Sequence, residues 1–185
     1  MNMFIPNIKK LLFLFIGLIV NLSVTGQNLK NFVIEDSKVH WQHIYTLEYS
    51  QSEFLNNLRL SGDFLELTQF DSTISGDTKP FQADLAGAGF TNFTAPMYIS
   101  GCDITGFVTI ELKQNKYRVT LKNIKFIQRQ SNGLFEKGVV LSIEDFALKS
   151  NKKEYRRLFG KSASQILDYT FIEKFKIKKA ATSDW

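Results

Sequence analysis

Two stretches in the middle of the chain alternate between apolar and polar residues, and this period of two limits the possible folds most strongly. Thr105–Leu112 and Tyr117–Ile127 have apolar residues at alternate positions, which is typical of strands with one buried face. The link between them contains Asn115, which tolerates a left-handed turn, so we predict a tight antiparallel hairpin. The apolar positions change parity near Asn123, which indicates a bulge there or a second buried face.

Further strands are predicted upstream of this hairpin. Lys38–Tyr49 alternates in the same way, and Phe64–Phe70 and Thr73–Lys79 read as two strands joined by a short turn. Met97–Ser100 is expected to be a short strand before the main hairpin. Hairpin-linked strands form an antiparallel sheet, whose apolar face must be covered by other elements.

Two regions have helical spacing and can provide that cover. Ser50 and Glu53 have the spacing of a capping box, which predicts a helix over residues 51–61. From Ser142 the apolar spacing is again helical, and Gly160 is expected to break it before a last helix capped by one of two nearby serines. The sequence therefore predicts an α+β fold, with about five to six antiparallel strands covered on one face by a short N-terminal helix and by C-terminal helices.

Residues 1–26 have the layout of a secretory signal peptide. Lys9 and Lys10 precede a ten-residue apolar run, and Val24 and Gly26 stand at positions −3 and −1 of the expected cut. An uncleaved membrane anchor is the less favoured alternative, because a span needs about 20 apolar residues. We expect export to the periplasm, the cell envelope or the exterior, without lipidation, because no Cys lies near the cut.

The rest of the chain is expected to be one α+β domain over residues 27–175, followed by a loose basic tail over residues 176–185. Its charge is uneven, since residues 149–179 contain ten Lys and Arg against three acids. This segment is either a solvated helix face or a surface that docks on the anionic envelope.

Candidate catalytic and metal-binding residues are few. Two His and one Cys in the whole chain exclude Cys-rich zinc modules, iron–sulfur clusters and internal disulfides. His40 and His43 fall on opposite faces of a strand, so they are not expected to share a metal. Cys102 could act as a nucleophile only beside a base, and a lone Cys is more often a small buried apolar residue. We therefore predict no catalytic residue, no metal and no cofactor.

The longest segment without a period covers residues 82–96, which contain two Gly and one Pro. Loops of this length in compact domains are often functional. Asp84, Phe90 and Phe93 are the candidate ligand-binding residues in it. Residues 116–122 mix aromatic and basic side chains and could stack nucleic-acid bases, but alternate strand residues are more often core, so no nucleic acid is expected as a partner.

Several of these segments resemble an exported Bacteroidota family that carries domain of unknown function 4468, described as having a TBP-like fold. The resemblance covers most of residues 38–172 and rests on VHWQHIYTLEYS, SGDFLELTQF with STISGDTKP, ADLAGAGF with PMYI, GFVTIELKQNKYRVTLKNIKF, SIEDFALK and SQILDYTF. It implies a curved antiparallel sheet with helices on one side. It implies no activity, and the fold name does not imply DNA binding, because function resides in sites.

These observations favour an exported, non-catalytic envelope domain that binds a small ligand or a protein partner. One alternative is an envelope hydrolase whose site is assembled only by folding. Another is a module that contacts an anionic envelope surface through residues 149–179. The identity of the ligand and the oligomeric state stay open at this point.

Overall fold

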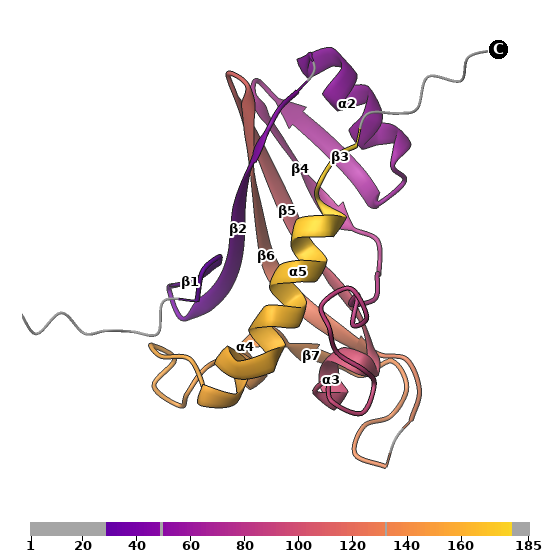
Figure 1. Cartoon of the computed structure of the whole chain (residues 1–185), viewed down its shortest axis with the longest axis vertical. Coiled ribbons are helices and arrows are strands. Elements are labelled where there is room, and N and C mark those ends of the chain that lie inside the picture. The colour runs from indigo at the N-terminus through magenta and orange to yellow at the C-terminus, as the bar shows by residue number, and fades with distance from the viewer. Residues whose placement is uncertain (1–28, 49, 132, 179–185) are drawn as a thin grey trace, which may run out of the picture.

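One antiparallel sheet organises the computed structural model, which describes residues 29–48, 50–131 and 133–178. Its strands follow the order β1–β2–β6–β5–β4–β3, and β7 pairs with β6 (Figure 1). The expected signal peptide, residues 1–26, and the tail beyond residue 178 lie outside the described residues. The elements in chain order are β1 (Phe32–Glu35), β2 (Lys38–Thr46), α2 (Gln51–Leu60), β3 (Phe64–Phe70), β4 (Thr73–Thr78), α3 (Met97–Ser100), β5 (Cys102–Lys113), β6 (Lys116–Gln128), β7 (Val140–Ser142), α4 (Ile143–Ala147), the π-helical turn η1 (Phe159–Ala163) and α5 (Ser164–Lys174).

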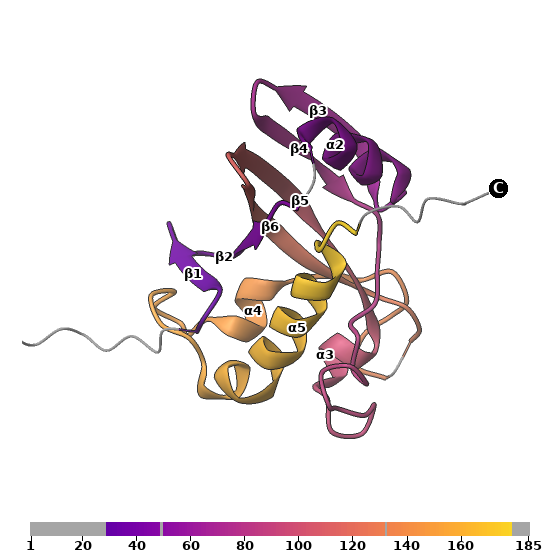
Figure 2. The ribbon, with the colours of Figure 1, turned by 45° about the horizontal axis from the view of Figure 1, so that its top comes forward.

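The described helices all pack on the same face of this sheet (Figure 1 and Figure 2). Each of α2, α3, α4 and α5 places an aromatic ring against an inward-pointing ring of β2 or β6: Phe54 on Tyr117, Tyr98 and Phe146 on Phe126, and Phe171 on Trp41. These rings join the aliphatic residues of β5 and β6 in a single core. The predicted α+β fold with a one-sided helical cover is confirmed, with seven described strands in place of about five to six.

The predicted central hairpin is confirmed, and its two strands extend beyond the alternating runs that predicted them. β5 and β6 pair from Lys113↔Lys116 at the turn to Cys102↔Gln128 at the far end. Their register shifts between Thr105 and Phe107, and Asn123, opposite this shift, has φ of +50°. The predicted bulge near Asn123 is therefore confirmed, and it explains the change of parity in the apolar positions.

Two strands lie where the sequence analysis expected none. β1 pairs with the first residues of β2 across the turn Asp36–Ser37, whose φ angles are +49° and +62°. Two left-handed residues make the tight hairpin turn that suits the twist of the flanking strands. β7 contributes three residues beside the end of β6. Strands of three or four residues are too short to establish a period of two.

The prediction of a strand at Met97–Ser100 is wrong, because these residues form the short helix α3. Pro96 precedes the helix, its carbonyl accepts from the amide of Ser100, and that of Met97 accepts from Gly101. Proline has a φ that suits the start of a helix. The ring of Tyr98 then stacks on Phe146 with centroids 3.9 Å apart, a contact with a distant segment that four residues of sequence do not reveal.

The predicted break at Gly160 is also wrong. The backbone is helical from residue 157 to Lys174, and Gly160 lies in the π-helical turn η1. Ser162 and Ser164, the two candidate caps, lie inside this continuous helix. A helical Gly costs about 1 kcal/mol relative to Ala, and burial of Phe159 on one side of the turn and of Ile166 on the other offsets this cost. No described helix is long and apolar enough to cross a membrane.

Candidate functional site

The described helices lie on one face of the sheet, and the opposite face has no described helix on it (Figure 2). We call it the open face. It is made by the strand residues that alternate with core residues, and the pairs Thr109↔Thr120, Ser75↔Thr109 and Phe107↔Lys122 fix its register. Its centre consists of Gln42, Ile44, Ser75, Phe107, Thr109, Glu111, Arg118, Thr120, Lys122 and Lys125.

Side chains of three kinds meet on the open face. Hydroxyls lie at its centre, where the partly exposed Thr109 and the buried Thr120 are cross-strand partners. Apolar side chains stand among them, and Ile44 is 61% exposed in the part of β2 that lies beyond its pairing with β1. Cations follow β6. Single exposed apolar residues are common on protein surfaces, so the hollows beside these side chains carry more information.

A groove of about 720 Å³ lies at the hairpin end of the open face. Ile44 and the residues of the β5–β6 turn line it, together with Glu111 and Arg118. Nε and Nη2 of Arg118 both contact Glu111 Oε2, at 2.7 and 2.6 Å. Lys113 and Lys116 line the same groove, so its rim carries more positive than negative charge.

A second hollow of about 290 Å³ lies beside the bulge, between Leu65, Phe107 and Lys125. The close approach of β5 to β6 here requires a glycine, because a Cβ on Gly106 would lie 2.9 Å from the carbonyl oxygen of Lys122. The amide of Gly106 donates to the hydroxyl of Thr78 instead of to a regular ladder partner. The bulge thus interrupts the flat surface of the sheet and leaves a recess on the open face.

The three predicted loop residues lie in different environments. Asp84 Oδ1 accepts from the amide of Gly87 at 2.8 Å, and the amide of Asp84 donates to Thr170 on α5. Phe90 is partly buried against the core, whereas Phe93 is 100% exposed. Loop 82–96 is therefore anchored to α5 at its start and carries an exposed ring further on.

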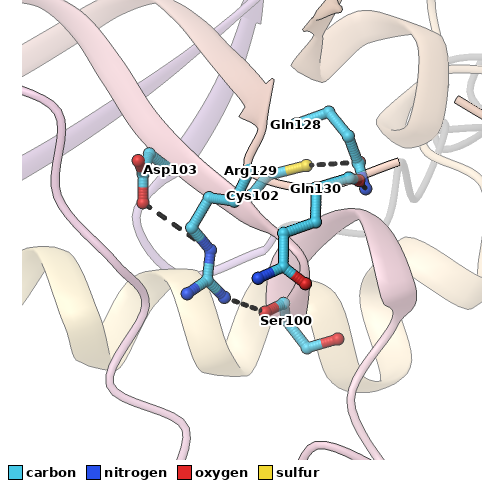
Figure 3. Close-up of polar contacts among 6 residues, drawn as sticks. All are labelled: Ser100, Cys102, Asp103, Gln128, Arg129 and Gln130. Atoms are coloured by element: carbon cyan, nitrogen blue, oxygen red, sulfur yellow. Dashed lines mark hydrogen bonds and ion pairs between the residues drawn. The ribbon is translucent and has the colours of Figure 1, made fainter. Parts of the chain in front are cut away.

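Cys102 lies at the start of β5 among polar side chains (Figure 3). Its thiol is buried and donates to Gln128 Oε1 at 3.2 Å, while the Gln128 amide nitrogen donates to the carbonyl of Gln130. Burial raises the pKa of this thiol. A nucleophilic Cys needs a lowered pKa and a base as partner, so this environment suits a packed residue better than a nucleophile.

The side chain of the neighbouring Arg129 contacts both a backbone carbonyl and a carboxylate (Figure 3). Its Nη2 donates to the carbonyl of Ser100, and its Nε lies 3.8 Å from Asp103 Oδ1. Arg129 therefore ties the end of β6 to α3 and to β5. The buried Nε has no hydrogen-bond partner, so the Asp103 contact is an ion pair at long range.

The two imidazoles lie on opposite faces of β2, as predicted. His43 stacks on Trp41 on the helix side, and its Nδ1 lies 3.5 Å from Asn31 Oδ1. His40 is 8% exposed, with Nδ1 3.3 Å from Glu35 Oε2. Burial is the largest cause that lowers the pKa of each imidazole. Within the described ranges, no group of three or more His, Cys, Asp or Glu side chains is placed to hold a metal ion.

The prediction that the aromatic residue of segment 116–122 belongs to the core is confirmed. Tyr117 is buried, and its ring stacks on Tyr45 with centroids 4.7 Å apart. The basic residues of the same segment point to the open face. The sequence predicts correctly which β6 residues point to the core. It does not predict the open face as a site, because the alternation of β6 does not show which face of the sheet other elements cover.

Comparison with solved structures finds similar chains. The chain is similar to a TBP-like protein from Parabacteroides distasonis, with 16% identity and a TM-score of 0.47 over 77% of this chain and 90% of that one. It is also similar to a DUF4468 family protein from Bacteroides ovatus, with 15% identity and a TM-score of 0.46 over 78% of this chain and 88% of that one. Both descriptions agree with the family and fold that the sequence motifs resemble, and neither names an enzymatic activity. No protein-family model matches the chain, and no curated protein matches it.

Proposed function

We propose that this chain is an exported, non-catalytic domain of the cell envelope that binds its partner on the open face of its sheet. One observation carries the proposal: all described helices pack on one side, and the other side exposes Ile44 and the recess at Phe107 among polar side chains. Antiparallel sheets can keep one face in water, but recessed apolar groups on such a face favour a ligand or a protein partner.

Site-specific photo-cross-linking tests the location of the partner. A photoreactive amino acid replaces Thr109, at the centre of the open face, in the chain expressed in its own host. The same amino acid replaces Phe93 in loop 82–96 and Lys161 on the helix side as matched positions. We expect cross-linked products or retained small-molecule adducts at position 109 above the level at Lys161. Products confined to position 93 would move the binding site to the loop and overturn the proposal.

The export part of the proposal rests on the layout of residues 1–26. Fractionation of the host, followed by intact mass measurement of the purified chain, tests it. We expect a chain that begins at Gln27 in the periplasmic or envelope fraction. A full-length chain in the cytoplasmic fraction would contradict export.

A further inference from the structure

We infer that the open face binds an anionic polysaccharide laid along β6. The inference rests on the proposed function and names the chemical class of the partner. Four cations of β6 stand on the open face: Lys116, Arg118, Lys122 and Lys125. With a rise of about 3.3 Å per residue, the row from Lys116 to Lys125 is about 30 Å long, which matches a linear polymer of several sugar units.

Most of this row lacks a counter-charge. Arg118 contacts Glu111, but Lys116, Lys122 and Lys125 form no ion pair with any carboxylate in the part of the chain that the structure describes. Asp77 is the acid that shares the hollow with Lys125. The three lysines present positive charge along one strand face, and a ligand that supplies carboxylate, sulfate or phosphate groups complements that charge.

The groups between the cations suit sugars. Thr109 places a partly exposed hydroxyl at the centre of the row, next to the buried Thr120, and the partly exposed Gln42 lies opposite Thr120 on β2. Hydroxyl and amide groups both donate and accept hydrogen bonds, as sugar hydroxyls do. Phe107 lies in the hollow beside Lys125, where its ring can pack against the apolar face of a sugar ring.

Other anionic partners fit the same surface less well. Single-stranded nucleic acid needs a series of exposed rings on which successive bases stack. Tyr117 and Phe126 of β6 are buried, so Phe107 is the one ring among the residues named above for the centre of the open face. A bilayer presents a plane, whereas this row follows one strand of a twisted sheet.

Three cations of the basic segment 149–179 have partners within the fold. Lys149 pairs with Glu154, and Lys174 pairs with Asp63 at 2.5 Å. Nε of Arg156 donates to the carbonyl of Leu148. Part of the charge of this segment is therefore used within the fold, and the anionic partner is assigned to β6.

Binding to dextran sulfate, with unmodified dextran as the uncharged control of the same backbone, tests the inference. We expect the mature chain, residues 27–185, to bind dextran sulfate and not dextran. The triple variant Lys116→Gln, Lys122→Gln, Lys125→Gln is expected to bind about tenfold more weakly or worse, about 1.4 kcal/mol. The control variant Lys152→Gln, Lys153→Gln, Lys161→Gln removes the same charge from exposed residues away from the row and is expected to change the affinity less than about twofold.

Each contrary outcome is distinguishable from failure of the proposed function. Equal weakening in both triple variants would show general charge attraction and overturn the inference. Absence of binding, or tighter β6-dependent binding to a single-stranded oligonucleotide or to anionic vesicles, would also overturn it. Cross-linking at position 109 tests the open face itself and does not depend on the charge of the partner. Urea unfolding of both variants establishes that they fold.

Discussion

At the scale of single residues, His40 is expected to make the stability of the fold depend on pH. Burial first, and then the charge of Lys122, lower its pKa from the ordinary 6.5, against the opposite effects of Glu35 and Glu144. The unfolded chain therefore binds this proton more readily than the folded protein. The free energy of unfolding is then expected to fall as the pH drops through about 6.5 and below, and to be insensitive to this group at higher pH.

Urea unfolding at pH 7.5 and at pH 5.5 measures this effect. We expect the wild type to lose stability between the two pH values and the variant His40→Gln to lose less. The comparison uses the difference between pH values, because the substitution changes packing at both. His43→Gln is the companion variant, since burial also lowers the pKa of His43. An unchanged pH dependence in His40→Gln would contradict the prediction.

Cys102 provides a second prediction at this scale. The thiol is buried, and burial raises its pKa, so little thiolate is present near neutral pH and reagents have poor access to it. We expect DTNB to leave the native protein unmodified during the time in which it labels the urea-unfolded chain completely. Rapid labelling of the native protein would instead indicate a solvent-open thiol and would favour the hydrolase alternative.

Asp168 joins the last helix to the sheet. Its Oδ1 accepts from the indole N–H of Trp41 at 2.8 Å and from the Asn31 amide at 2.6 Å. Asp168→Ala leaves the N–H of the fully buried Trp41 without its acceptor, and we expect a loss of about 1–3 kcal/mol in unfolding free energy. Asp168→Asn retains an acceptor oxygen and is expected to lose less. Urea unfolding followed by Trp41 fluorescence in a Trp185→Phe background measures both, and equal losses would contradict the hydrogen-bond argument.

At the scale of elements, the start of α2 depends on its capping box. The amide of Glu53 donates to Ser50 Oγ, and the amide of Ser50 donates to Glu53 Oε2. We expect Ser50→Ala to lower the unfolding free energy by about 1 kcal/mol. The control is Asn56→Ala in the exposed middle of the same helix, which is expected to be neutral or slightly stabilising because Ala is the better helix former. Equal effects of the two substitutions would show that the box adds no stability.

The elements also show which parts of the fold the sequence could predict. Alternating runs identified β2, β5 and β6, two shorter runs joined by a turn identified β3 and β4, and a serine three residues before a glutamate identified α2, because these signals are local. α3 and the uninterrupted helix at Gly160 depend on tertiary packing, here Tyr98 on Phe146 and the buried ring of Phe159. The candidate site was missed for the same reason. The alternation of β6 predicts that Arg118 and Lys122 point away from the core. That no described helix covers them follows only from the arrangement of all the described elements.

At the scale of the whole molecule, the sheet has a protected centre and exposed edges. β5 and β6 are its longest strands, each has a strand on both sides, and they pair with each other along nearly their whole length. β3 is an edge strand in the described fold, with Leu65 63% and Phe70 77% exposed. Backbone amides exchange through local opening where few contacts hold them and only through global unfolding where many do.

Hydrogen–deuterium exchange of the chain is therefore expected to be slowest in β5 and β6 and faster by at least about tenfold in β3, since an edge strand opens without disrupting the core. The amides of Val108 and Ile110, which face β4 or β6, provide the internal reference for global unfolding. Protection of β3 equal to that of β5, in a sample that is dilute enough to be monomeric, would contradict this gradient. Protection of β3 that appears only as the concentration rises would show that the sheet continues from β3 into a second copy, because unpaired edge groups are a template for strand pairing.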